Sequence, residues 1–209
     1  MRIAILAWGS LIWDRRGLNI AKDFKPRGPL LPVEFCRLSG GGRLTLVIDE
    51  AFGTSCPTYV AESACGDLDA ALENLWIREG SLDEVLPNNV RTHGRVGFVE
   101  VASGDCSAKA LGRHPKSVAT IKTWAQASGF DAAIWTALAS NFHEPEKAGE
   151  PFSVEAVIRY LETADAPKLS AALGYIRSAP SEVQTPVRAA VDVRWPEGRT
   201  DHARRGTGV

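Results

Sequence analysis

Hydrophobic and polar positions along this chain follow two different patterns. Mostly in the first half, short runs rich in β-branched or aromatic residues end at turn-forming residues, which is typical of β-strands. These runs predict strands at residues 2–8, 32–38, 43–49, 57–62, 95–101 and 187–195. The sequence Ser-Gly-Gly-Gly at residues 39–42 separates two of them and predicts a hairpin turn, because glycine adopts the positive φ angles that such turns require.

Apolar residues at helical spacing occur mainly in the second half. The first helix is predicted at residues 67–79, with Asp67 capping its start and Gly80 just past its end. Its apolar face consists of Leu68, Leu72, Leu75 and Trp76. Four more helices are predicted from these groups: Val118, Ile121 and Trp124; Ile134, Trp135 and Leu138, behind a cap at Asp131; Val154, Val157, Ile158 and Leu161, behind Ser153; and Leu169, Leu173 and Ile176, behind Pro167.

This order of elements predicts an α+β protein rather than an alternating βαβ arrangement. With 209 residues, 44% of them hydrophobic, the chain can build a substantial core. No internal repeat, low-complexity linker or domain boundary divides the sequence. We therefore expect a single domain over residues 1–209, with a mobile charged end at residues 196–209.

The charge balance excludes some classes of partner. The chain has 24 Lys and Arg against 25 Asp and Glu, which lacks the basic footprint of nucleic-acid-binding proteins or of a polybasic membrane anchor. The uncharged run at residues 3–13 is shorter than the roughly 20 residues of a membrane span. It leads directly into acidic and basic residues without a small-residue cleavage site, so we interpret it as a buried strand and a turn rather than a signal peptide.

The four cysteines form no CxxC pair, and the chain is too large to depend on disulfides. We expect Cys36, Cys56, Cys65 and Cys106 to be reduced and mostly buried, which favours a cytosolic protein; a disulfide is the alternative.

Several common catalytic patterns are absent from the sequence. The glycines at residues 40–42 lack the order of a phosphate-binding P-loop, and no GxSxG sequence provides a hydrolase serine. The four histidines lie at residues 93, 114, 143 and 202, without the spacing of a zinc site, and we interpret them as surface or structural residues. The sequence therefore predicts no metal site.

Two features could carry chemistry. At Trp8, Gly9, Ser10 and Leu11 a buried strand breaks into a turn, where exposed backbone N–H groups can accept a carboxylate and small side chains let a ligand approach. Such turns are also common without any ligand. Trp8 and Trp13 are candidates for the wall of a pocket, and a core position is the alternative for Trp13.

The second feature is Glu79, which continues the apolar stripe of the predicted helix instead of facing solvent. Burial disfavours the charged form of a carboxyl group and so raises its pKa. A carboxyl group with a raised pKa suits general acid–base catalysis near neutral pH. The alternative is a helix-terminal glutamate paired with Arg78 or another cation.

Together these features resemble the γ-glutamylcyclotransferase-like family. Residues 8–13 (WGSLIW) are similar to its YGSL signature, in the form found in the ChaC-type, glutathione-degrading branch. Residues 75–79 (LWIRE) resemble that branch's second motif, whose glutamate is the catalytic acid/base. Residues 35–39 (FCRLS) are similar to an intervening family strand. Trp8 stands where the family has tyrosine, and no hydroxyl contact can come from it.

The resemblance implies that the six predicted strands form a small mixed β-barrel or sheet with surrounding helices. It also implies an enzyme that cyclises a γ-glutamyl peptide or amine to 5-oxoproline without a cofactor, with Glu79 as acid/base. Residues 8–11 would bind the α-carboxylate of this small-molecule substrate or the developing oxyanion. The alternative function is a non-catalytic module that binds a small ligand or a partner protein on the same fold.

Overall fold

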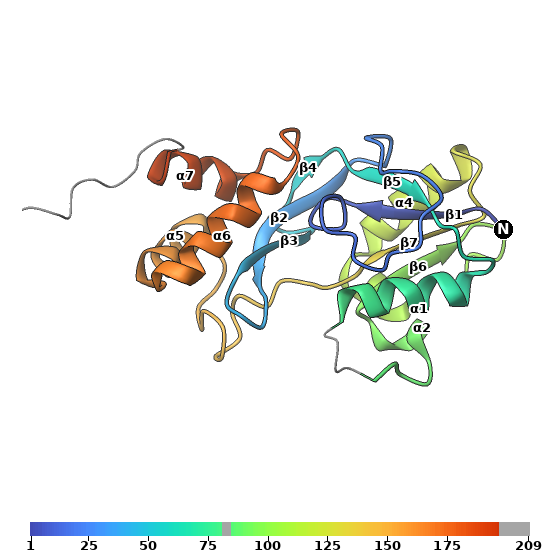
Figure 1. Ribbon diagram of the computed structural model, residues 1–209, viewed down its shortest axis with the longest axis horizontal. Helices are drawn as coiled ribbons and strands as arrows, with labels where there is room; N and C mark the ends of the chain where they lie inside the picture. Colours follow the sequence, from blue (N-terminus) through green and yellow to red (C-terminus); the bar gives the residue numbers. More distant parts are fainter. Residues whose placement is uncertain (81–84, 197–209) are drawn as a thin grey trace, which may run out of the picture.

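The computed structural model describes residues 1–80 and 85–196. Within them, seven strands form two sheets and seven helices pack around the sheets, so the protein is an α+β protein (Figure 1). The predicted mobile end at residues 196–209 lies outside the described residues except for Pro196. The strands are β1 (Ile3–Ala7), β2 (Leu31–Leu38), β3 (Leu44–Ile48), β4 (Thr54–Cys56), β5 (Tyr59–Glu62), β6 (Val96–Glu100) and β7 (Ala132–Thr136). The helices are α1 (Leu68–Glu79), α2 (Val90–His93), α3 (Ala108–Arg113), α4 (Pro115–Ala127), α5 (Val154–Thr163), α6 (Ala166–Ser178) and α7 (Pro186–Arg194).

The first strand lies inside a four-stranded sheet of order β5-β1-β7-β6. It runs antiparallel to β5 and parallel to β7, and both of its faces are covered. Ile5 packs in one core with Leu72 and Leu75 of α1, whereas Leu6 packs in a second core with Ile121 of α4. Burial on both faces explains why this strand is an unbroken apolar run rather than an alternating one.

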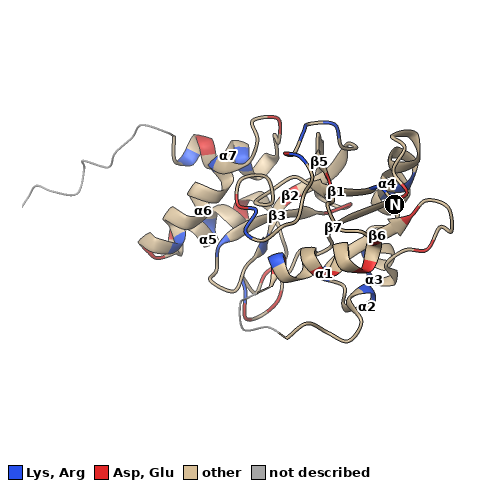
Figure 2. Ribbon diagram, turned by 45° about the vertical axis from the view of Figure 1, so that its right-hand side comes forward, with Lys and Arg blue, Asp and Glu red and all other residues tan. Residues whose placement is uncertain are grey.

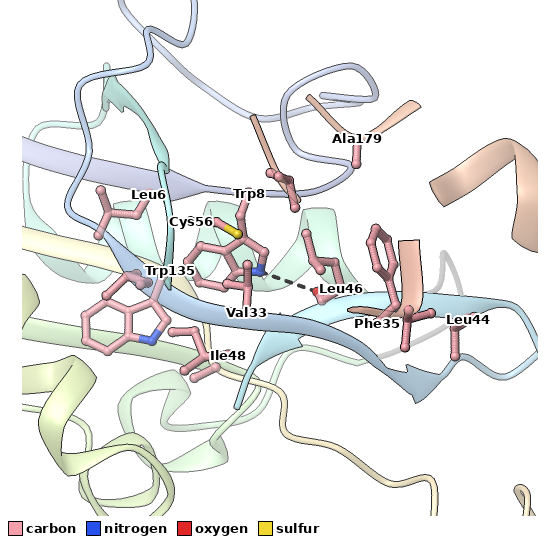
Figure 3. Packing of buried hydrophobic residues seen from close by; sticks show 14 of the residues in the cluster. Leu6, Trp8, Val33, Phe35, Leu44, Leu46, Ile48, Cys56, Trp135 and Ala179 are labelled. Carbon is pink, nitrogen blue, oxygen red and sulfur yellow. Dashed lines mark hydrogen bonds between the residues drawn. The ribbon is translucent and has the colours of Figure 1, made fainter. Parts of the chain in front are cut away.

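The second sheet has three strands in the order β3-β2-β4. Its hairpin turn is confirmed: the Gly42 N–H donates to the Ser39 carbonyl at 3.0 Å, and Gly42 has a φ of +74°, which glycine adopts readily. Trp8 packs beside Val33, Phe35 and Leu46 of this sheet, and Trp135 of the first sheet belongs to the same core (Figure 3).

The two sheets therefore share a hydrophobic core, but the described strands form two separate sheets and no closed barrel. The expectation of a barrel is not confirmed, and there are seven strands where six were predicted. The short elements β4, α2 and α3 gave no periodic signal in the sequence, because each spans fewer than two helical turns or only a few strand positions.

The helix predicted around Ile134, Trp135 and Leu138 is wrong. This segment contains β7, which lies between β1 and β6 and is buried on both faces. A short run that is apolar on both faces matches a helix and a buried strand equally well. Asp131, expected to cap that helix, instead accepts a hydrogen bond from the Arg2 backbone N–H at 2.6 Å.

The strand predicted at residues 187–195 is also wrong, because this segment forms α7. Its valines were interpreted as a strand signal. Val187 and Val191, four positions apart, are buried, whereas Val193 is 84% exposed. Thr185 caps the helix and Pro186 occupies its first turn. A capping residue and a following proline are the local signals that outweigh the strand preference of valine here.

Candidate functional site

The turn after β1 leaves backbone donors without a protein acceptor. Two of its carbonyls are occupied: the Ile12 N–H donates to the Gly9 carbonyl at 3.0 Å, and the Asp14 N–H donates to the Ser10 carbonyl at 2.8 Å. Among the described residues, the N–H groups of Gly9 and Leu11 have no acceptor from the protein. A turn with free N–H groups is suited to bind an anionic group.

Glu79 ends α1, and its side chain is 12% exposed. It forms a close ion pair with Arg78, whose side chain is 3% exposed. The pairing with Arg78 proposed as an alternative from the sequence is therefore present. Arg78 also donates to Ser10 Oγ at 3.1 Å and, through Nε, to the Asp14 carbonyl at 3.2 Å. One buried guanidinium thus connects the carboxylate of the second motif to the turn of the first.

Both motifs line one cavity of about 420 Å³. The turn contributes all four predicted residues, Trp8, Gly9, Ser10 and Leu11, and α1 contributes Arg78 and Glu79. Further walls come from the β2–β3 hairpin, from β7 and from Tyr175 on α6. The fold therefore brings together residues that are far apart in the sequence and that were predicted to act together.

The charge of the cavity lining differs from that of the whole chain. Basic and acidic positions are interspersed over the helices and loops (Figure 2), and the chain as a whole carries a net charge of −1. Five arginines line the cavity against two carboxylates: Arg16, Arg37, Arg43, Arg78 and Arg95 against Asp14 and Glu79. This local excess of positive charge favours a ligand with carboxylate groups.

The two tryptophans of the turn have different roles. Trp8 is 4% exposed, and its indole packs in the core while its N–H donates to the Leu46 carbonyl at 3.3 Å (Figure 3). Trp13 is 38% exposed, so a core role for it is wrong, and it is not among the residues that line the cavity. Its ring meets the ring of Tyr175 edge-on, with 5.4 Å between centroids.

Tyr175 is a site residue that sequence reasoning missed. It lies on the predicted helix behind Pro167 but outside the apolar group that identified that helix. Nothing local indicated a site there, because its partners on the β1 turn are more than 160 positions away in the sequence. Arg43, at the end of the glycine hairpin, lies 4.9 Å from the centroid of the Tyr175 ring and was also missed.

Arg37 was noted only within the family-like strand at residues 35–39. Its Nη1 donates to the Ala139 carbonyl at 2.7 Å, which holds the side chain along one wall of the cavity. Burial lowers the pKa of Arg37, and the charge of Glu144 opposes that effect. The guanidinium is a strong enough base to stay charged at neutral pH despite this shift.

No family model, curated protein or solved structure matches this chain. Within residues 1–80 and 85–196, no three His, Cys, Asp or Glu side chains are placed to hold a metal ion together. None of the helices in this part of the chain combines the length and the apolar character needed to cross a membrane. All four cysteines are free; Cys36 and Cys56 are buried, and Cys65 and Cys106 are half-buried.

Proposed function

We propose that this protein is a γ-glutamylcyclotransferase-like enzyme that converts a γ-glutamyl peptide or amine to 5-oxoproline and releases the amine or amino acid. The observation that carries the proposal is the cavity in which Glu79 and the turn at Gly9 and Ser10 meet through Arg78. The small β-barrel that the family resemblance implies is part of the same proposal. The hydrophobic core that the two sheets share is compatible with it.

The cavity suits such a substrate in size and charge. A volume of about 420 Å³ lies within the range of roughly 300–1,000 Å³ of small-molecule sites. The free N–H groups of Gly9 and Leu11 can bind the α-carboxylate of the glutamyl group or the developing oxyanion. Arg37 and Arg43 line the same cavity and can pair with a carboxylate on the leaving group.

The reaction needs proton transfers but no external reactant. The neutral α-amine attacks the γ-carbonyl carbon, which forms a ring C–N bond and places a negative charge on the carbonyl oxygen. The carboxylate of Glu79 accepts the extra proton of the attacking nitrogen and then gives it to the leaving nitrogen. The bond to the leaving nitrogen breaks as the carbonyl re-forms, and Glu79 is ionised again.

The chain contributes mainly by holding the substrate in a ring-closing conformation, because the nucleophile and the carbonyl already belong to one molecule. Arg78 holds the Glu79 carboxylate beside the turn through its contacts with Ser10 and Asp14. We expect Arg78 to position the carboxylate rather than to touch the substrate, because its side chain is almost completely buried.

The deciding test is the variant Glu79→Gln. The amide is nearly isosteric but cannot accept the proton, so we expect 5-oxoproline release to be lost while the fold is retained. The loss of one general acid/base typically costs about 10²–10⁴-fold in rate. The assay measures 5-oxoproline released from glutathione, γ-glutamyl dipeptides and γ-glutamyl amines, and circular dichroism checks the fold.

Glu73→Gln is the matched control, because Glu73 lies on the same helix, is exposed and does not line the cavity. It should keep wild-type turnover. Turnover of Glu79→Gln within a few-fold of wild type would remove Glu79 from the mechanism.

The second candidate function is a binding module without catalysis. The ion pair between Arg78 and Glu79 favours it, because a paired carboxylate can serve structure alone. A panel member that raises the melting temperature without yielding product, equally in wild type and Glu79→Gln, would establish this function instead.

A further inference from the structure

Tyr175 brings a hydroxyl group from α6 to the turn after β1. The phenol lines the cavity, and the whole residue is 8% exposed. A Cβ added at Gly9 would lie 2.7 Å from the Tyr175 hydroxyl oxygen, closer than real Cβ atoms approach another heavy atom. The absence of a side chain at Gly9 is therefore what lets this hydroxyl reach the turn.

The ring of Tyr175 is fixed by its neighbours. Phe35 and Trp13 meet it edge-on, with 6.3 Å and 5.4 Å between ring centroids, and the Arg43 guanidinium lies 4.9 Å from its centroid. These contacts surround the ring with groups from β2, the β1 turn and the hairpin. A hydroxyl held this firmly is preorganised, so little energy is needed to orient it during a reaction.

The hydroxyl remains a hydrogen-bond donor at neutral pH. Burial raises the pKa of Tyr175, backbone hydrogen bonds with Ser10 and Leu46 oppose the rise, and the negative charge of Glu79 adds to it. The group therefore stays a neutral phenol and keeps its proton. It cannot act as the base, but it can donate to an oxygen that gains negative charge.

We propose that Tyr175 contacts the substrate directly and donates a hydrogen bond to the γ-carbonyl oxygen as that oxygen becomes negatively charged. This inference rests on the proposed cyclotransferase function. Glu79 must reach both nitrogens bonded to the γ-carbon, and Tyr175 lies in the same cavity against the turn, within electrostatic range of that carboxylate.

The first experiment compares Tyr175→Phe with Tyr160→Phe in the full-length chain. Tyr160 on α5 is a matched control, because its hydroxyl donates to the Gly42 carbonyl at 2.6 Å but does not line the cavity. Loss of one oxyanion donor typically lowers kcat about 10²–10³-fold. We expect a loss of that size in Tyr175→Phe with KM changed less than three-fold, and wild-type kcat in Tyr160→Phe.

The outcomes separate the two proposals. Product from wild type, with kcat unchanged in Tyr175→Phe or reduced equally in Tyr160→Phe, overturns the role of Tyr175 and leaves the cyclotransferase function standing. No product from wild type with any substrate of the panel overturns both.

A second experiment tests the placement of the hydroxyl without an activity assay. Gly9→Ala should lower the melting temperature, because the new Cβ collides with the Tyr175 oxygen. In Gly9→Ala/Tyr175→Phe that oxygen is gone, and the next ring atom lies 3.7 Å from the Cβ, which is ordinary contact. We expect the double variant to regain most of the lost stability. Additive losses from the two substitutions would contradict the placement and overturn the proposal.

Discussion

At the scale of single residues, His114 is a polar side chain whose surroundings affect its pKa. It lies at the junction of α3 and α4, is 5% exposed, and neither of its ring nitrogens has a hydrogen-bond partner among the described residues. Burial lowers the pKa of His114; the charges of Glu50 and Asp49 oppose this effect, and that of Arg113 adds to it. The sequence interpretation of this histidine as structural fits its position outside the cavity.

We predict that His114 makes the fold sensitive to acid. The unfolded chain protonates this histidine near its ordinary pKa of 6.5, whereas the folded chain does so only at lower pH. The unfolded state therefore binds more protons as the pH falls below 6.5, so the free energy of unfolding decreases as the pH falls through that range. His114→Gln should reduce this slope.

The measurement is the free energy of unfolding by urea at pH 7, 6 and 5. His143→Gln serves as the control, because it replaces an exposed histidine instead of a buried one. Identical slopes in wild type and His114→Gln would contradict the prediction.

At the scale of elements, the three C-terminal helices lie beside the β2–β3–β4 sheet, and α6 carries Tyr175 to the site (Figure 1). The start of α7 is tied to β2: Glu34 is buried in that strand, and its carboxylate accepts from the Val187 N–H at 3.4 Å. Thr185 caps the same helix by accepting from the Arg188 N–H at 3.3 Å. These contacts satisfy N–H groups that the first turn of a helix leaves without partners.

We predict that Thr185→Ala destabilises the fold by about 1 kcal/mol, the usual cost of removing a threonine cap. Guanidinium unfolding at pH 7 gives the difference. The matched control is Ser181→Ala, because Ser181 is exposed, precedes the helix and caps nothing there. A loss in Ser181→Ala as large as that in Thr185→Ala would show that the cap is not the cause.

At the scale of the whole molecule, a nearly neutral chain concentrates positive charge at one cavity. The five arginines that line it come from the loop after β1, from β2, from the β2–β3 hairpin, from α1 and from the position just before β6. No single segment carries a basic run, so this field exists only once the chain is folded. It should attract substrates in proportion to their negative charge.

We therefore predict that salt weakens the binding of an anionic substrate more than that of a neutral one. Raising KCl from about 0.05 M to about 0.5 M shortens the screening length below about 10 Å. KM should rise several-fold for a γ-glutamyl dipeptide with a free carboxylate and much less for a γ-glutamyl alkylamine, with kcat little changed. Equal increases in KM for both substrates would contradict the prediction.

The sequence alone determined those features that depend on residues close together in the chain. The cap at Asp67, the glycine hairpin and the break of β1 at Gly9 are local, because each is set by the conformational preferences or hydrogen-bonding groups of a few neighbouring residues. The helical spacing from Leu68 to Leu75 predicted which face of α1 is buried. Glu79 and the turn could be paired only through the family resemblance.

Tertiary structure decided the rest, because long-range burial and packing leave no short pattern in the sequence. Residues 132–136 form a strand because β1 and β6 lie on either side of them, and a run that is apolar on both faces does not itself indicate a strand. Tyr175 reaches Gly9 only because α6 packs near β3 and the turn has no side chain in the way. The arginines gather at one cavity for the same reason: folding brings five separate segments to one place, and only then do their charges add.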